Sequence, residues 1–300
     1  MAEHEVRLGI DLGGTKTEII ALGPDGAALQ RRRVATPHAD YGALLACLCD
    51  LVRAADAQFG GHASVGVGIP GALSQVDGRV KNANSSVLIG KPLKEDLEHV
   101  LGCEVRIAND ANCFALSEAT DGAAAGAGVV FGVILGTGVG GGIAVDRRVM
   151  VGANAIAGEW GHNPLPLPGA GDVPLPTCYC GRPGCIEAYL SGPALQRDHL
   201  SAAGVALLPE EIAARALQGD AQCEVTLARY EQRLARSLAG VINILDPDVI
   251  VLGGGVSNID RLYERVPELW LEHIFSDRVV TRLKRNRHGD SSGVRGAAWL

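Results

Sequence analysis

Residues 8–16 read LGIDLGGTK, and residues 133–140 read VILGTGVG. Both stretches have the same form, in which apolar residues typical of strands lie on either side of a glycine turn. Glycine lets a backbone turn sharply and bring its N–H groups up against an anion. The two stretches therefore predict two β-hairpins that face each other and grip a polyphosphate, for which a nucleoside triphosphate is the obvious ligand.

Two better-known phosphate motifs fit these glycines less well. Gly136, Gly138 and Gly141 match the dinucleotide pattern G-x-G-x-x-G, but that pattern requires a following helix, whereas residues 143–145 indicate a returning strand. The first turn is not a Walker P-loop, because its lysine, Lys16, comes one position late. A nicotinamide-dependent oxidoreductase is the alternative that these glycines leave open, and it would need a helix after Gly141.

Length and composition indicate a two-domain enzyme. The chain has 300 residues, of which 47% are hydrophobic and only 4% aromatic, so we expect cores built from small aliphatic side chains. The alternation of predicted strands and helices is typical of an α/β protein. We expect a small lobe over residues 1–110, completed by a C-terminal helix at about 288–300, and a large lobe over residues 111–287.

Charge and hydropathy exclude several classes of partner. The formal net charge is −7, which disfavours nucleic acid and anionic membranes as partners, and Arg31–Arg33 is interpreted as a solvated strand end. No apolar stretch reaches the ~18 residues that span a bilayer, and the N-terminal residues do not resemble a secretory signal. We therefore expect a cytoplasmic protein.

Three cysteines are grouped in one loop. Cys178, Cys180 and Cys185 lie within eight residues, together with glycines and a proline, which is a poor setting for a cytosolic disulfide. A tetrahedral zinc site takes four ligands, and His162 can complete a Cys₃His set. Because the protein would fill all four positions, the zinc would be structural, and a redox-active loop is the alternative.

Several polar residues lie where chemistry is expected. Asp110 follows the predicted strand 105–108 and begins a helix, so it could accept a proton during phosphoryl transfer or simply cap that helix. Asp11 adjoins the first glycine turn and could hold Mg²⁺. Residues 253–255 are three glycines after a buried strand, which suit either the approach of a planar base or a plain tight turn.

A polyol is the ligand that the remaining polar residues suit. Glu159 and Glu187 flank the outer ligands of the predicted zinc site, so an ordered loop would present both carboxylates. Together with Asn84 and Asn109, these carboxylates supply hydrogen-bond acceptors and donors that can contact neighbouring hydroxyl groups of a polyol. For either glutamate alone, a surface role or a role in supporting the ligands is the alternative.

Together, these motifs resemble the bacterial sugar kinases of the ROK family, and the likeness runs from Gly9 to the last residue. The segments that carry it are DLGGTK at 11–16, LGTGVG at 135–140, GEWGH at 158–162 and C-x-C-G-x-x-G-C-x-E at 178–187. The resemblance implies the two-lobed actin-like, hexokinase-like ATPase fold, also described as ribonuclease H-like, with its active-site cleft between the lobes.

The resemblance also implies roles for single residues. It makes Asp110 the general base and places ATP and Mg²⁺ on both glycine turns. The residues implied for the nucleotide and its metal are Asp11, Gly13, Gly14, Thr15, Lys16, Gly136, Thr137, Gly138, Gly254 and Gly255. Those implied for the sugar are Asn84, Asn109, Asp110, Glu159, His162 and Glu187, while His162, Cys178, Cys180 and Cys185 bind the zinc.

Within the family, residues 81–85, 107–113, 159–166 and 288–299 look most like fructokinases of the mannofructokinase type. We therefore expect fructose to be converted to fructose 6-phosphate, with mannose and glucose as secondary substrates. N-acetylglucosamine or N-acetylmannosamine kinase is the alternative within the family, and a sugar-sensing regulator is the alternative outside catalysis. Resembling kinases are commonly dimers, so a homodimer is expected.

Overall fold

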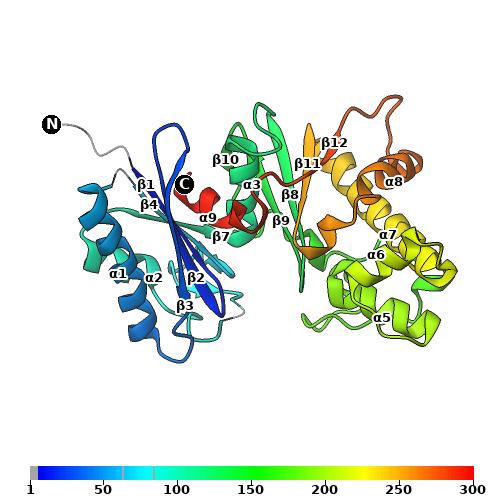
Figure 1. Ribbon diagram of the computed structural model, residues 1–300, viewed down its shortest axis with the longest axis horizontal. Helices are drawn as coiled ribbons and strands as arrows, with labels where there is room; N and C mark the ends of the chain where they lie inside the picture. The colour runs from blue at the N-terminus through cyan, green and yellow to red at the C-terminus, as the bar shows by residue number, and fades with distance from the viewer. Residues whose placement is uncertain (1–5, 63, 84) are drawn as a thin grey trace. The chain divides into compact units, whose positions relative to one another are not determined.

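The computed structural model describes residues 6–62, 64–83 and 85–300. These form two compact units, shown as a ribbon in Figure 1. The first unit comprises Met1–Gly126, Gly142–Ala157 and Asp290–Leu300, and the second comprises Ala127–Gly141 and Gly158–Gly289. This division differs from the predicted boundary after residue 110, because the helix that begins there packs within the first unit.

The first unit is built on a five-stranded mixed sheet of order β3-β2-β1-β4-β7. Three antiparallel strands form the expected meander, and two parallel strands follow on the other side of β1. Their bounds are Arg7–Leu12 for β1, Lys16–Leu22 for β2, Ala28–Ala35 for β3, Ser64–Ile69 for β4 and Val105–Asn109 for β7.

The alternation of side chains along β1 determines the face of the sheet on which Asp11 lies. Leu8, Ile10 and Leu12 are buried in the core under helices α1 (Tyr41–Phe59) and α2 (Leu93–Leu101). The intervening residues point to the opposite face, because successive side chains alternate across a sheet. That face is covered by the C-terminal helix α9 (Ser292–Ala298), and Figure 1 shows the two helical layers on the two sides of the sheet.

The approach of α9 to the sheet depends on glycine. A Cβ atom on Gly9 would lie 2.3 Å from the carbonyl oxygen of Val294, and one on Gly66 would lie 1.8 Å from that of Ala297. Only residues without a side chain fit at these two positions. The same face therefore brings Asp11 beside α9, where a Cβ on Gly293 would lie 3.2 Å from its Oδ2.

Helix α3 (Asp110–Thr120) follows β7 without a loop, and nearly all of it is buried. Just beyond its end at Thr120, the buried carboxylate of Glu118 accepts the N–H of Ala123 at 2.7 Å, and the chain turns away from the helix. Two short elements lie outside the predicted pattern, namely the hairpin of β5 (Ala72–Leu73) and β6 (Val80–Lys81).

The basic run of β3 is not merely solvated. Arg31 and Arg33 both form ion pairs with Glu18, whose side chain is buried on the neighbouring strand β2. All three arginines are exposed, as the interpretation of a solvated strand end expects, and two of them also pair with Glu18. A buried carboxylate requires partners of this kind, since an unpaired buried charge is costly.

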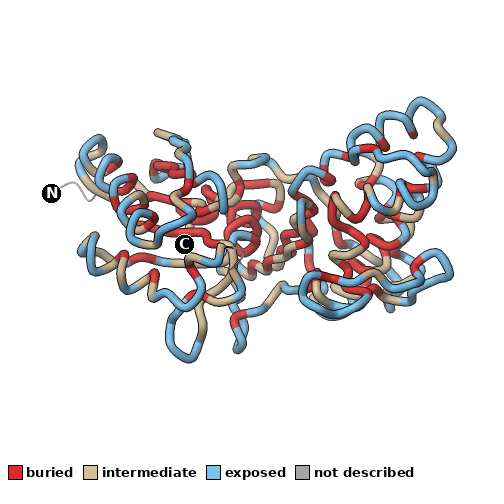
Figure 2. Tube along the Cα trace, turned by 90° about the horizontal axis from the view of Figure 1, so that it is seen from below, coloured by how far each residue is buried: buried red, intermediate tan, exposed pale blue. Residues whose placement is uncertain are grey.

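The second sheet has the order β10-β9-β8-β11-β12. Its parallel strand β11 is buried along its whole length, as expected of a strand covered on both faces. Figure 2 shows buried residues along the strands in the interior of each unit. The bounds are Val129–Leu135 for β8, Val139–Val145 for β9, Arg148–Val149 for β10, Val249–Gly253 for β11 and Arg282–Arg285 for β12.

Two helices follow the cysteine loop directly. Helix α4 (Glu187–Leu190) ends at Ser191, whose side chain caps α5 (Gly192–Ala203) by accepting the N–H of Ala194 at 3.3 Å. Gly192 donates its N–H outside the helices, to the carbonyl oxygen of Gly136 at 2.8 Å. The remaining helices of the second unit are α6 (Pro209–Leu217), α7 (Ala221–Leu245) and α8 (Leu262–Leu269).

Short 3₁₀ segments connect these elements. They are η1 (Trp160–His162), η2 (Ala170–Asp172), η3 (Gly255–Asn258), η4 (Trp270–His273) and η5 (Gly289–Ser291). Within the described part of the chain, no helix has both the length and the apolar character needed to cross a membrane.

Candidate functional site

The first glycine turn is closed by its own backbone. Gly13 donates its N–H to the carbonyl oxygen of Lys16 at 3.1 Å, which leaves Gly14 and Thr15 exposed at the tip. Among the described residues, no group accepts a hydrogen bond from the N–H of Gly14 or of Thr15. Two adjacent N–H groups of this kind can bind an anion.

Thr36 holds this turn in place, although no sequence pattern marks it as part of the site. Its buried hydroxyl donates to the carbonyl oxygen of Gly13 at 2.8 Å and contacts the hydroxyl of Thr17 at 2.8 Å. Its N–H donates to the carbonyl oxygen of Thr15 at 3.0 Å. The turn is therefore fixed from one side by the residue that follows β3.

The second glycine turn repeats the construction. Gly136 donates its N–H to the carbonyl oxygen of Gly138 at 3.0 Å, and Thr137 is exposed at the tip. No described group accepts a hydrogen bond from the N–H of Thr137 or of Gly138. Each unit thus carries one hairpin turn suited to a phosphate group.

The triple glycine after β11 lies against the second turn. Gly254 has a φ of +81°, which favours glycine, and a Cβ atom there would lie 2.5 Å from the carbonyl oxygen of Leu135. Gly255 faces open space, since a Cβ there would meet nothing within 4 Å. A residue with a side chain at 254 would collide with the hairpin, which explains the glycine at this position.

Two carboxylates of the first unit influence each other. Burial raises the pKa of Asp11 to about 6, the negative charges of Asp110 and Glu18 add to this shift, and Arg33 opposes it. Asp110 is exposed at the first position of α3. A bound cation would relieve the cost of ionising Asp11 in this place.

The capping role at α3 falls to Asn109. Its Oδ1 accepts the N–H of Ala111 at 2.9 Å, and its Nδ2 donates to the carbonyl oxygen of Gly71 at 3.1 Å. Asp110 Oδ1 lies 2.8 Å from the same N–H. Asn109 thus orients the start of the helix that carries Asp110, while Asn84 lies outside the described residues.

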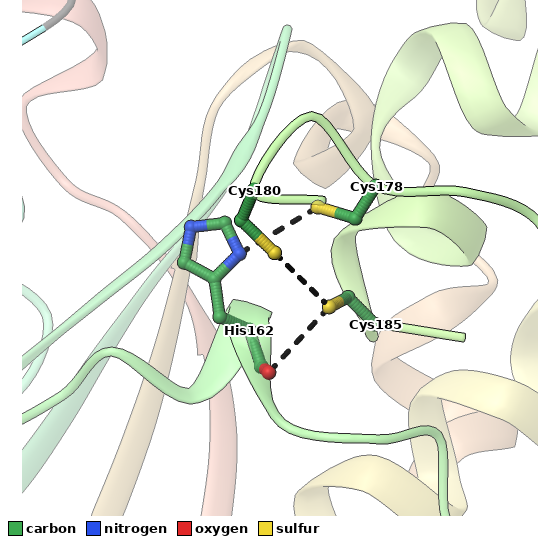
Figure 3. A group of neighbouring side chains, drawn as sticks. All are labelled: His162, Cys178, Cys180 and Cys185. Atoms are coloured by element: carbon green, nitrogen blue, oxygen red, sulfur yellow. Dashed lines mark hydrogen bonds between the residues drawn. The ribbon is translucent and has the colours of Figure 1, made fainter. Parts of the chain in front are cut away.

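The four expected metal ligands of the second unit come together (Figure 3). One ligand atom from each of His162, Cys178, Cys180 and Cys185 lies within 4.8 Å of all the others. The Sγ atoms of Cys180 and Cys185 are 3.6 Å apart, and Cys178 Sγ is 3.6 Å from His162 Nδ1. Around a tetrahedral zinc these separations would be about 3.8 Å and about 3.6 Å. The donor set and its spacing fit structural zinc.

The second ring nitrogen of His162 contacts Tyr179. The distance from His162 Nε2 to the phenol oxygen is 3.1 Å, and the two rings meet edge to face. Such a contact on the outer nitrogen holds the ring so that Nδ1 faces the cysteines. Tyr179, between two of the cysteines in sequence, was not among the predicted residues.

Glu159, His162 and Glu187 share one neighbourhood. Burial raises the pKa of Tyr179, followed by the negative charges of Glu187, Cys178 and Glu159, so both carboxylates act on this phenol. Glu187 Oε2 also accepts the N–H of Val139 at 2.9 Å. The second unit therefore gathers the acceptors expected for a polyol next to the Cys/His cluster.

The family model for the ROK family matches residues 7–300. The chain belongs to the ROK family. It is 42% identical over 296 residues to an N-acetyl-D-glucosamine kinase of Salmonella paratyphi A, covering 97% of this chain and 98% of that protein. It is 43% identical over 307 residues to an N-acetyl-D-glucosamine kinase of Erwinia tasmaniensis, with the same coverage.

Solved structures of ROK proteins have the same fold. The ROK hexokinase of Thermus thermophilus has a TM-score of 0.86 and 31% identity, covering 98% of this chain and 97% of that one. A ROK glucokinase of Streptomyces griseus, solved with glucose and AMPPNP, has a TM-score of 0.76 and 28% identity, covering 98% of each chain. The expected fold and a sugar kinase of the ROK family are confirmed, whereas these relatives give no support to the fructokinase subtype.

Replacement of Asp11 in this ROK protein should change stability in a pH-dependent way. Because the folded-state pKa lies above the ordinary value of 3.8, ionisation of Asp11 removes stability as the pH rises through about 4 to 6. We expect Asp11→Asn to raise the melting temperature, by an amount that grows from pH 4.5 to pH 7.5 in buffer without Mg²⁺ or nucleotide. Asp50→Asn, at an exposed position on α1, is the control, and a benefit that is equal at both pH values would contradict the assignment.

Replacement of Cys180 tests the metal centre. We expect Cys180→Ser to lose the bound metal, since it removes one of four ligands, and to lower the melting temperature. Elemental analysis of the purified protein measures the zinc, with Cys47→Ser as the control because Cys47 lies in the first unit. Wild-type protein that carries no zinc and is fully active would rule out a structural zinc site.

Proposed function

We propose that this protein is an ATP-dependent N-acetyl-D-glucosamine kinase that phosphorylates the primary hydroxyl of its sugar. The proposed substrate is supported by the 42–43% identity to N-acetyl-D-glucosamine kinases across 97% of the chain. Fructose, expected from the sequence, lacks comparable support. The choice between hexoses depends on a few contacts, since one methyl or hydroxyl group changes preference by only ~1–3 kcal/mol.

The two glycine turns support ATP as the donor. Each turn offers two adjacent backbone N–H groups with no acceptor among the described residues, one pair at Gly14 and Thr15 and the other at Thr137 and Gly138. Phosphate oxygens are suitable acceptors for such groups. The open space at Gly255, beside the second turn, suits the adenosine of the same nucleotide.

Asp110 is the residue we propose as general base. It would take the proton from the sugar hydroxyl as that oxygen attacks the γ-phosphorus. The new oxygen–phosphorus bond forms while the bond to the bridging oxygen breaks, and ADP leaves. Its exposed position at the start of α3 leaves the carboxylate accessible, and Asn109 fixes the backbone at that point.

Asp11 is the residue we propose to hold Mg²⁺, directly or through water. The ion would neutralise phosphate charge and favour the ionised form of Asp11, whose pKa is raised to about 6 without it. Zinc would be held by His162 and the three cysteines and would order the loop that presents Glu159 and Glu187 to the sugar.

A panel of acceptor sugars tests the proposed substrate. ADP release would be measured with Mg·ATP and N-acetyl-D-glucosamine, N-acetyl-D-mannosamine, D-glucose, D-mannose or D-fructose, with a reaction lacking sugar as the control. We expect kcat/KM for N-acetyl-D-glucosamine to exceed that for fructose by at least roughly 10-fold, the lower end of what one added group contributes.

The other outcomes separate the parts of the proposal. A preference for fructose or mannose would overturn the N-acetylated substrate and leave the kinase reaction in place. Sugar binding without ADP release from any member of the panel would overturn the kinase and favour a sugar-sensing regulator.

A further inference from the structure

Glu187 touches two parts of the second unit at once. Its Oε2 accepts the N–H of Val139, the residue that follows the second glycine turn, at 2.9 Å. Its Oε1 lies 3.8 Å from Cys178 Sγ, one of the four ligand atoms of the Cys/His cluster. One carboxylate thus connects the cluster with the turn that is proposed to bind phosphate.

The turn is shaped to receive this carboxylate. A Cβ atom on Gly138 would lie 2.7 Å from Glu187 Oε2, so a larger residue at 138 would displace the side chain. Gly138 therefore serves two purposes, because it permits the turn and leaves room for Glu187. This second purpose is not visible from the glycine pattern.

The segment of residues 187–192 contacts both ends of the second glycine turn. Gly192 donates its N–H to the carbonyl oxygen of Gly136 at 2.8 Å, and Glu187 holds Val139 three residues later in the turn. Residues 187–192 therefore form a hydrogen bond with the chain at each end of the turn.

The Cys/His cluster fixes the start of this segment. Cys185 comes two residues before Glu187, and the intervening Ile186 donates its N–H to the carbonyl oxygen of Asn163, next to His162. A metal that joins Cys185 to His162 would hold both chains at this point. The position of Glu187 would then depend on whether His162 and the three cysteines are held together by the metal.

We propose that Glu187 is a positioning residue for the nucleotide. When the Cys/His cluster is ordered, Glu187 holds the second glycine turn in the shape that binds phosphate. Removal of the metal should therefore weaken nucleotide binding as well as disturb the sugar side. The inference rests on the proposed function, in that the turn must bind nucleotide phosphates. This role of Glu187 toward the nucleotide differs from the contact with the sugar that the family resemblance implies for the same residue.

Nucleotide binding without sugar separates the two roles. The affinity of the zinc-loaded protein for AMPPNP with Mg²⁺ would be measured by calorimetry for wild type, Glu187→Ala and Glu187→Gln. We expect Glu187→Ala to weaken binding about 10-fold, because the N–H of Val139 loses its acceptor. Glu187→Gln should stay within about 3-fold of wild type, since its amide oxygen can accept the same hydrogen bond.

Glu159→Ala is the matched control. Glu159 is a carboxylate of the same neighbourhood, and none of its described contacts is with the second turn, so its removal should leave nucleotide affinity unchanged. Equal affinities for Glu187→Ala and Glu159→Ala would overturn the inference. A wild-type protein that binds no AMPPNP, with or without sugar, would overturn the proposed function and this inference together.

Metal removal tests the coupling itself. Zinc would be stripped from wild type and from Glu187→Ala with a chelator, checked by elemental analysis, and AMPPNP affinity measured again. We expect stripping to weaken binding in wild type and to have little further effect in Glu187→Ala, because both changes act through one carboxylate. Independent, additive losses would show that the metal does not act through Glu187. Should stripping unfold the protein, the zinc-loaded variants alone decide the role of Glu187.

Discussion

Each glycine turn has to keep one shape while leaving adjacent backbone N–H groups without a protein acceptor. Unpaired N–H groups do not hold a turn together, so the single backbone hydrogen bond that closes each turn is supplemented by contacts from other residues. In the first unit Thr36 supplies them, through hydrogen bonds to the carbonyl oxygens of Gly13 and Thr15 and a third with Thr17. In the second unit they come from Glu187 and Gly192. The proposed nucleotide site therefore depends on residues that never touch a phosphate.

A second constraint comes from carboxylates placed where ionisation is costly. Asp11 lies on the α9 face of its sheet because β1 alternates, and its pKa is raised to about 6 by burial and by neighbouring negative charge. By contrast Glu18, on the next strand, is paired with Arg31 and Arg33. The carboxylate of Glu18 is thus satisfied by two arginines, whereas that of Asp11 is the one proposed to hold a cation.

Much of this organisation could be predicted from the sequence where it depends on local patterns. Glycine turns between apolar residues have a recognisable form, and the spacing of Cys178, Cys180 and Cys185 marked a loop that a distant His162 completes. What could not be predicted depends on contacts between distant residues. Nothing local shows that Thr36 holds Gly13, that Gly192 donates a hydrogen bond to Gly136, or that Arg31 and Arg33 pair with Glu18. The choice of sugar is harder to predict, because hexoses differ by single groups; the sequence pattern favoured fructose, whereas the proposed N-acetyl-D-glucosamine rests on whole-chain relatives.

We propose that Asp110 removes a proton during phosphoryl transfer, and a single-turnover experiment isolates this step from product release. Excess enzyme, Mg·ATP and N-acetyl-D-glucosamine would be mixed and quenched, and sugar phosphate measured for wild type, Asp110→Asn and the exposed control Asp50→Asn. We expect Asp110→Asn to slow transfer by at least ~10²-fold, the lower end for losing a general base, while AMPPNP affinity and melting temperature stay near wild type. A transfer rate close to wild type would show that Asp110 is not the base.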